Sequence, residues 1–368
     1  MNKILVITSN IAPYRLRWEE ELAKYFDVTI AYTKDREKDR DEKFLKHQSE
    51  ICHIHKLNNP KDKDDPICFD VIKLLKENRD SFVLFDGYGL KTNILGMLYY
   101  KLKGKRRFVN VDGFALGEKE NKLKDIVKRF IIKNLCTDFF CSSEVTKKHL
   151  IEYGAKEDRI YVHNFSSISK DRIIESPLKK EEKLKIRKQL GIDSEKKIVL
   201  GVGQFIPRKR FEDLIIAVKN CKTDCDLYIL GGKATKGYLD LVGDNKNIHF
   251  LDFVAPEDVD KYYLMADLFV LSSQTDVWGL VLNEAMANGL PVISSDNCIA
   301  GLSMIDGNGI IYKTGNIDEL IKAIDYCLID ENNLKMANRS LEIIKDYCIE
   351  SMVDKQLPII NKYFENIN

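Results

Sequence analysis

The chain has 368 residues and a mass of 42.5 kDa; 44% of the residues are hydrophobic and 31% are charged. Its 58 Lys and Arg residues nearly balance its 57 Asp and Glu residues, which excludes a uniformly basic nucleic-acid coat and an acidic tail protein. This length and composition are typical of about two globular domains.

The near-neutral total hides an uneven distribution of charge. Residues 1–165 carry 32 basic and 26 acidic side chains, and residues 101–150 alone hold 13 basic against 6 acidic. A basic region of this size suits a phosphate-bearing ligand or an anionic membrane surface. The alternative is an ordinary solvated face. The sequence carries no RNA-binding signature, so we expect no nucleic-acid partner.

The cysteines and the apolar runs indicate the cellular compartment in which the protein is expected. Nine cysteines are scattered without the repeated pairing of a zinc site, so we expect reduced thiols and no required metal or other cofactor. The first apolar run, residues 4–8, predicts a strand rather than a signal peptide. No run approaches the length of a membrane span. These features favour a cytoplasmic protein, either free or held peripherally on the cytoplasmic face of the membrane.

Short β-branched and aromatic runs, separated by helical patterns, recur along the chain. The predicted strands are Lys3–Thr8, Asp27–Tyr32, Phe82–Phe85, Arg107–Val111, Asp138–Cys141, Arg159–His163, Lys197–Val202, Asp226–Leu230, Asn247–Leu251, Leu268–Ser272, Pro291–Ser294 and Gly309–Tyr312. Because the runs are almost continuously apolar, they indicate parallel strands covered on both faces. Two sets of six predict an α/β protein of two doubly wound domains, with a linker and a helix over Ser166–Gln189.

Residues 119–135 are basic and predict an amphipathic helix. Ile126, Val127, Phe130 and Ile131 can share one stripe with lysines around it. We expect this stripe to face the core, with a solvated basic side. The alternative is a patch that touches the inner membrane surface, from which a lipid-linked acceptor would follow.

The stretch Thr275–Ser294 follows a predicted strand and contains a candidate anion site. A helix is expected from about Gly279 to Asn288. The unpaired amides of Gly279, Leu280 and Val281 would then open the helix and suit a diphosphate.

Two carboxylates accompany the start of this helix. Asp276 precedes it and Glu284 lies inside it, with seven residues between them. One carboxylate can face a bound sugar while the other accepts both hydroxyls of a ribose. The alternative is that Asp276 caps the helix and Glu284 lies on a solvated face.

A cationic cluster follows another strand of the second half. The strand Lys197–Val202 leads into Gly203 and a turn, after which Arg208, Lys209 and Arg210 open a helical pattern. Ligands bind at the carboxyl ends of strands in α/β sheets, so two or three positive charges there would stabilise a departing diphosphate. The alternative is an exposed run of basic side chains.

Together the two segments resemble the retaining family-4 glycosyltransferases. The spacing Asp276-x7-Glu284 is similar to the family's acidic pair, usually Glu-x7-Glu, and residues 285–293 match the pattern that follows it. The run Gly203-Gln204…Arg208-Lys209-Arg210 is similar to the family's Gly-Arg…Arg-Lys-Gly donor motif. The resemblance is clearest over residues 197–312 and implies the GT-B architecture, in which two Rossmann-like domains face a central cleft.

The resemblance also implies a role for each residue. Lys209, with Arg208, would hold the donor phosphates, Glu284 the ribose, and Asp276 the transferred sugar. The family keeps the anomeric configuration, and the departing phosphate takes the acceptor proton. Most of the rate enhancement would then come from stabilising the charge that develops and from orienting the reacting groups.

Three positions depart from the family pattern. Gln204 replaces a basic residue; it can donate a hydrogen bond but carries no charge. Arg210 stands where the family has glycine, so the following helix can start differently. Asp276 is shorter than the usual glutamate, which reduces its reach toward a sugar hydroxyl.

The first half supplies candidates on the acceptor side. The family places a loop, often glycine-rich, after the first strand, and here this loop contains Ala12 and Pro13. Tyr14 and Arg15 could face the cleft or simply pack at the start of a helix.

A second acceptor-side loop follows the strand Arg107–Val111. Many relatives carry a histidine near this point, whereas this chain has Asp112 followed by Gly113. Asp112 could orient the acceptor hydroxyl and assist catalysis. The alternative is a plain Asp-Gly turn.

These observations predict an acceptor domain over residues 1–168 with 351–368, and a donor domain over residues 180–350. The expected activity is retaining transfer of a sugar from a nucleotide sugar, with UDP as the expected nucleotide, to a glycan or a lipid-linked glycan. The alternatives are another GT-B enzyme, such as a nucleotide-sugar epimerase or a phosphorylase, and a non-catalytic protein that binds nucleotide sugars or glycans.

Overall fold

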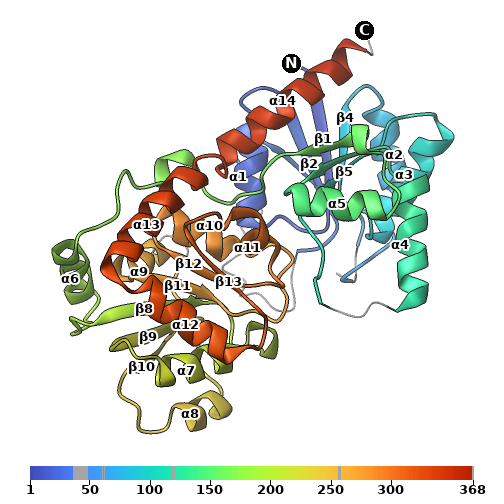
Figure 1. Cartoon of the computed structure of the whole chain (residues 1–368). Coiled ribbons are helices and arrows are strands. Elements are labelled where there is room, and N and C mark those ends of the chain that lie inside the picture. The colour runs from blue at the N-terminus through green and yellow to red at the C-terminus, as the bar shows by residue number, and fades with distance from the viewer. Residues whose placement is uncertain (36–48, 60, 62, 118–120, 256–257, 367–368) are drawn as a thin grey trace. The chain divides into compact units, whose positions relative to one another are not determined.

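A computed structural model describes residues 1–35, 49–59, 61, 63–117, 121–255 and 258–366. The chain forms two compact units, shown with their elements in Figure 1. The first consists of Met1–Gly113, Lys119–Ser167 and Cys348–Asn368, and the second of Phe114–Glu118 and Ile168–Tyr347.

The first unit contains a parallel sheet with the strand order β3-β2-β1-β4-β5-β6-β7. Its strands are β1 (Lys3–Thr8), β2 (Asp27–Tyr32), β3 (His53–Lys56), β4 (Phe82–Asp86), β5 (Phe108–Val111), β6 (Asp138–Cys141) and β7 (Ile160–Val162). The sequence predicted six of these seven strands, and β3 was missed. Because β3 is an edge strand with mostly exposed side chains, it lacks the apolar signature of the others.

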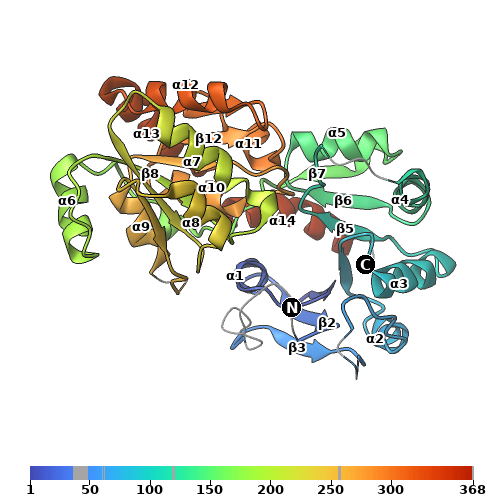
Figure 2. The same ribbon diagram turned by 90° about the horizontal axis from the view of Figure 1, so that it is seen from below.

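Helices cover both faces of this sheet. They are α1 (Pro13–Leu22), α2 (Val71–Glu77), α3 (Lys91–Leu102), α4 (Lys122–Asn134), α5 (Glu144–Glu152) and α14 (Ile349–Glu365). Figure 2 shows α1 and α14 on one side of the sheet and α2, α3 and α4 on the other. The C-terminal helix α14 packs along α1, so the end of the chain completes the first unit.

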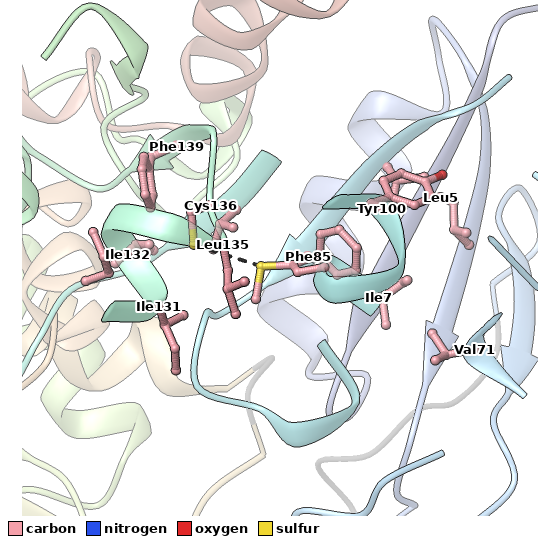
Figure 3. Packing of buried hydrophobic residues seen from close by; sticks show 14 of the residues in the cluster. Leu5, Ile7, Val71, Phe85, Tyr100, Ile131, Ile132, Leu135, Cys136 and Phe139 are labelled. Atoms are coloured by element: carbon pink, nitrogen blue, oxygen red, sulfur yellow. Dashed lines mark hydrogen bonds between the residues drawn. The ribbon is translucent and has the colours of Figure 1, made fainter. Parts of the chain in front are cut away.

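The core between the sheet and the second helical layer is apolar and close-packed. Leu5, Ile7 and Phe85 of the strands belong to one buried cluster with Tyr100 of α3 and Ile132 of α4 (Figure 3), and the Phe85 ring meets the Tyr100 ring edge-on at 6.1 Å. All five side chains are almost completely buried. The continuous apolar runs seen in the sequence are therefore the two covered faces of parallel strands.

The second unit repeats the plan with the strand order β10-β9-β8-β11-β12-β13, again all parallel. Its strands are β8 (Lys197–Val202), β9 (Cys225–Leu230), β10 (Ile248–Leu251), β11 (Leu268–Leu271), β12 (Val292–Ser295) and β13 (Gly309–Tyr312). All six were predicted: β8 and β13 have the predicted ends, and the ends of the other four are shifted by one residue. Two doubly wound parallel sheets confirm the predicted fold class.

The helices of the second unit surround this sheet. They are α6 (Lys180–Gln189), α7 (Phe211–Asn220), α8 (Lys236–Val242), α9 (Val259–Met265), α10 (Leu280–Ala287), α11 (Ile299–Met304), α12 (Ile317–Cys327) and α13 (Asp330–Ile344). The segment ahead of α6 is an extended linker with one 3-10 turn, Lys170–Arg172, as its composition indicated. Across the described parts of both units, we find no helix long and apolar enough to cross a bilayer.

Both sheets contain a point where the direction of chain progress reverses. In the first unit the chain builds β1, β2 and β3 toward one edge and then returns to place β4 beside β1. In the second unit it builds β8, β9 and β10 and returns to place β11 beside β8. Loops leave such a neighbouring pair in opposite directions, which opens a binding position at their carboxyl ends.

A buried histidine ties α14 to the first sheet. His163 follows β7 and is fully buried between the rings of Phe140 and Phe165. The Gln356 amide lies 2.6 Å from His163 Nδ1, and Trp18 Nε1 donates to Gln356 Oε1 at 2.9 Å. Burial, with smaller effects of nearby positive charges, lowers the pKa of His163 to about 3, so the ring is neutral.

Acid should therefore destabilise the protein through His163. The pKa of an unfolded histidine is near 6.5, so the unfolded chain binds this proton first as the pH falls. We expect the contribution of this group to the free energy of unfolding to be about 2 kcal/mol smaller at pH 5 than at pH 7. Urea unfolding of the wild type and of His163→Gln at pH 5 and pH 7 measures this change in the free energy of unfolding. The variant should lose less stability over this interval, and an equal loss would contradict the assignment.

Candidate functional site

The loop after β8 carries the predicted cationic cluster. Gly203 directly follows β8 and has a φ of 150°, and a Cβ there would lie 3.1 Å from Lys209 Cε. Gln204 follows, and Arg208 and Lys209 lie in a short 3-10 turn, Pro207–Lys209. Because β8 lies beside β11, this loop is next to the loop that contains Asp276.

Ion pairs and hydrogen bonds join the two loops. Lys209 Nζ lies 2.6 Å from Asp276 Oδ2, and Arg208 Nη1 lies 3.5 Å from the same oxygen. Arg208 also donates to the carbonyl of Thr275 at 3.0 Å. The Ser272 hydroxyl donates to the Lys209 carbonyl at 2.8 Å. Arg208, Lys209 and Asp276, which the sequence singled out separately, therefore form one cluster.

Arg210 does not join this cluster. Its guanidinium bonds to both oxygens of Asp213, at 2.6 and 3.0 Å, and to Gln274. Its backbone has a φ of 48°, in the left-handed region that glycine adopts freely and that costs other residues about 1 kcal/mol. Arg210, which stands where the family pattern has glycine, thus adopts a conformation that glycine adopts freely, and its side chain is held by Asp213.

The helix predicted after Asp276 is α10, and it begins beside the cluster. Gly279 caps it with a φ of 105°, and a Cβ there would lie 2.9 Å from both Leu271 Cδ2 and Cys298 Sγ. Only glycine fits this turn. The first amides of α10, those of Leu280 and Val281, have no acceptor within the helix. They supply the positive end of its dipole at the carboxyl edge of β11.

Glu284 lies one turn into α10 and is held by a residue that the sequence did not indicate. Tyr263 of α9 is fully buried, and its hydroxyl donates to Glu284 Oε2 at 2.7 Å. Burial and the Glu284 charge raise the pKa of Tyr263 well above 10, which keeps it a donor. Tyr263 thereby helps to orient the Glu284 carboxylate.

The surroundings of Glu284 extend to α9. Asn288 donates to the Glu284 carbonyl at 3.0 Å and to Asp260 at 3.3 Å, and Asp260 is paired with Arg172 at 2.7 Å. The sequence gave no link between Asp260 and the residues around Glu284, because the strand β11 separates α9 from α10 along the chain. Among the described residues, no three His, Cys, Asp or Glu side chains could jointly hold a metal ion.

The first unit has its own polar cluster at the corresponding position. Arg15, on the first turn of α1, lies 2.7 Å from Asp86 at the end of β4 and also forms an ion pair with Asp112 after β5. Thr8 donates to Asp86 at 2.8 Å, and Asn110 donates to both carboxylates. The sequence named Arg15 and Asp112 but gave no sign that they are partners.

The charges in this cluster depend on one another. Burial opposes the charge of Arg15, but Asp112 and Asp86 outweigh it, so the pKa of Arg15 is raised. Burial, and the nearby Asp86, raise the pKa of Asp112 to about 6 against the opposing effect of Arg15. Burial also raises the pKa of Glu19, one helical turn beyond Arg15, to about 8.

The remaining first-unit candidates have mainly structural contacts. Ala12 is buried as the residue before α1, and Pro13 occupies the first helical position, where a missing amide hydrogen costs nothing. The Tyr14 ring packs edge-on against Phe165 at 6.1 Å. Gly113 follows Asp112 with a φ of 155°, which favours glycine.

Removing the Arg15 charge should destabilise the first unit. Arg15→Met leaves Asp86 and Asp112 buried without a cation, which costs about 3–5 kcal/mol at pH 7. The loss should be smaller at pH 5, because unpaired carboxylates bind protons more readily. Arg79→Met, which removes a largely exposed partner of Asp80, is the control and should cost less than about 1 kcal/mol. Equal losses for the two variants in denaturant unfolding would contradict this account.

Comparison with known proteins connects these features to a family. Residues 182–342 match the family model described as glycosyl transferases group 1. An uncharacterized glycosyltransferase of Methanocaldococcus jannaschii is 32% identical over 41% of this chain and 40% of its own. The alpha-galactosylglucosyldiacylglycerol synthase of Streptococcus pneumoniae is 28% identical over 63% of this chain and 64% of its own. The chain thus spans less than two thirds of the length of either relative.

Solved structures extend the likeness to the whole chain. Sucrose-phosphate synthase from Thermosynechococcus elongatus superposes with a TM-score of 0.79 and 17% identity, covering all of both chains. Anabaena HepE in complex with UDP-glucose gives 0.74 and 19%, covering 98% of this chain and 100% of that one. These likenesses show the GT-B fold. Residues 182–342 of the second unit are similar to group 1 glycosyl transferases, and the two matched relatives are named as glycosyltransferase or glycolipid synthase.

Proposed function

We propose that the chain transfers a sugar, with retention of anomeric configuration, from a UDP-sugar to a hydroxyl of a glycan or lipid-linked glycan. The observation that carries this proposal is the pairing of Arg208 and Lys209 with Asp276, which lies three residues ahead of Gly279, the N-cap of α10. The named complexes of HepE with UDP and UDP-glucose support the choice of nucleotide. The names of several relatives, which are diacylglycerol glycolipid synthases, support a lipid-linked acceptor.

Each group of the donor site has a distinct task in this proposal. The diphosphate lies against Lys209, Arg208 and the first amides of α10, where three sources of positive charge meet negative oxygens. Glu284, oriented by Tyr263, accepts hydrogen bonds from the ribose hydroxyls. Asp276 accepts from hydroxyls of the transferred sugar. Gly203 leaves room for the phosphates beside Lys209, and Gln204 donates a neutral hydrogen bond.

The reaction then needs charge stabilisation more than a protein nucleophile. The bond between the anomeric carbon and the diphosphate oxygen breaks, and the acceptor oxygen bonds to the same face of that carbon. The acceptor proton passes to the departing phosphate oxygen. Negative charge grows on the diphosphate in the transition state, so Lys209 and Arg208 bind the transition state more tightly than the substrate.

Asp112 has the matching task on the acceptor side. Its side chain is 18% exposed, more than that of Asp86, so it is the more accessible carboxylate of the Arg15 cluster. With a pKa of about 6 it is mostly ionised at neutral pH and accepts a hydrogen bond from the acceptor hydroxyl. Arg15 and Asn110 hold it in place.

Substitution of the donor residues should separate binding from chemistry. Lys209→Met is expected to reduce kcat/KM at least about 100-fold, because a charge that stabilises the leaving group is lost. Glu284→Gln is expected mainly to raise the donor KM, about tenfold, because a ribose contact weakens. Lys197→Met, at the opposite end of β8, is the control and should leave kinetics unchanged.

The product distinguishes this function from its alternatives. A glycoside with the donor's anomeric configuration supports the proposal. A free epimer of the nucleotide sugar, or a sugar phosphate, indicates an epimerase or a phosphorylase. Donor binding in calorimetry without turnover on any acceptor indicates a binding protein. Near-normal turnover of both Lys209→Met and Glu284→Gln contradicts the assigned roles.

The face of α4 supports an acceptor that resides in a membrane. Leu123, Ile126, Val127 and Phe130 are between 50 and 67% exposed, on successive turns of one face. Ile131 is buried, so the stripe expected to face the core is divided between core and solvent. Exposed lysines lie on the same turns, which makes an anionic bilayer the complementary surface.

Vesicle binding tests this surface. The double variant Ile126→Ser/Phe130→Ser should weaken binding to phosphatidylglycerol vesicles at least about tenfold, because two apolar side chains no longer enter the interface. Leu334→Ser removes a comparably exposed leucine from α13 of the second unit and should have no effect. Wild-type binding that is absent, or equal on phosphatidylcholine vesicles, would exclude an anionic membrane as the partner.

A further inference from the structure

The two cations that meet the diphosphate in the proposed function already have a carboxylate partner. Lys209 Nζ and Arg208 Nη1 lie 2.6 and 3.5 Å from one oxygen, Asp276 Oδ2, and the Ser273 hydroxyl lies 3.3 Å from it. The side chains of Lys209 and Asp276 are only 11 and 14% exposed. A shielded pair of this kind is stronger than a surface ion pair, because water screens it less.

The backbones on both sides of this pair are fixed. The Asp276 amide donates to the Asn297 carbonyl at 3.0 Å, and the Asp276 carbonyl accepts from the Ile299 amide at 3.4 Å. On the other loop, the Arg208 carbonyl accepts from the Gln274 amide at 2.7 Å. A change of partner therefore requires only rotation of side-chain ends, with both loops in place.

We propose that Asp276 competes with the donor diphosphate for Lys209 and Arg208, and so makes the site select a nucleoside diphosphate that still carries its sugar. This inference rests on the proposed function. A diphosphate that takes Lys209 leaves the Asp276 carboxylate beside a second anion, which is unfavourable. The hydroxyls of an attached sugar donate to the displaced carboxylate and offset this loss. A sugar-free nucleoside diphosphate has no such donors.

The same competition acts after transfer. Once the sugar has left, Asp276 loses its hydroxyl partners and returns to Lys209, which weakens the hold on the product nucleotide. An aspartate suits this return to Lys209, because its short side chain places the carboxylate beside Lys209 and gives it few other positions. Asp276 is thus a specificity-determining residue as well as a sugar contact.

Calorimetry with UDP, UDP-glucose and uridine as probes tests the competition. Asp276→Asn keeps the shape and removes the charge, and should bind UDP about tenfold more tightly than the wild type at low salt. Uridine affinity should not change, because uridine carries no phosphate. The wild type should prefer UDP-glucose to UDP, and the variant should lose this preference. Asp276→Ser serves as a second variant if the first does not fold.

Two further variants locate the effect. Adding Lys209→Met to Asp276→Asn should remove the gain in UDP affinity, because the freed cation is gone. Asp306→Asn removes an exposed carboxylate that pairs with Arg339 at 2.6 Å and should leave UDP binding unchanged.

The outcomes separate this inference from the proposed function. UDP affinity that is unchanged or reduced in Asp276→Asn, while the wild type binds UDP-glucose, overturns the competition alone. An equal gain in Asp306→Asn overturns it as well, since general charge then explains the effect. A wild type that binds neither UDP nor UDP-glucose overturns both the competition and the proposed function.

Discussion

The ion pair between Lys209 and Asp276 depends on strand order. The two residues are 67 positions apart in the sequence, and they meet because β11 returns to lie beside β8. If β11 had instead been added beside β10, the loop that carries Lys209 and the loop that carries Asp276 would follow strands that are not neighbours. The first sheet makes the same arrangement, where β4 returns to β1 and Arg15 meets Asp86. In both units, the reversal of the strand order brings a cation that follows one strand to a carboxylate at or beyond the end of the neighbouring strand.

The backbone around the donor residues carries local strain that the surrounding contacts hold. Arg210 adopts a left-handed conformation although it has a side chain, and two hydrogen bonds to Asp213 compensate for this. Gly279 adopts a conformation in which any side chain would collide with Leu271 and Cys298. Strained positions of this kind are concentrated where function requires a fixed geometry. The conformation of Arg210 fixes the backbone directly after Lys209, and the conformation of Gly279 fixes the residue at which α10 begins.

Sequence patterns predicted the parts of this molecule that depend on local chemistry. Continuous apolar runs identified the buried strands, and the glycine and proline after α10 marked its end. The edge strand β3 was missed as a member of the sheet, because its exposed side chains do not need to be apolar. The partners of charged groups also could not be predicted. Tyr263 meets Glu284, and Asp86 meets Arg15, only after the sheet is assembled.

The face of α4 shows where periodicity is insufficient. A stripe of Ile126, Val127, Phe130 and Ile131 has the same pattern whether it faces a core or a bilayer. Only the packing tells that Ile131 is buried while the other three are exposed. The exposed part of this apolar stripe is the observation on which the proposed membrane contact rests.

The two polar clusters differ in a way that fits two different substrates. At the edge of the second sheet, Arg208 and Lys209 share one carboxylate, so positive charge is in excess and an incoming anion is favoured. At the edge of the first sheet, Arg15 is shared by Asp86 and Asp112, so negative charge is in excess and a hydroxyl donor is favoured. A diphosphate would be repelled by the excess negative charge of the first cluster. In the proposed function, this difference in charge balance assigns the donor diphosphate to the second unit and the acceptor hydroxyl to the first.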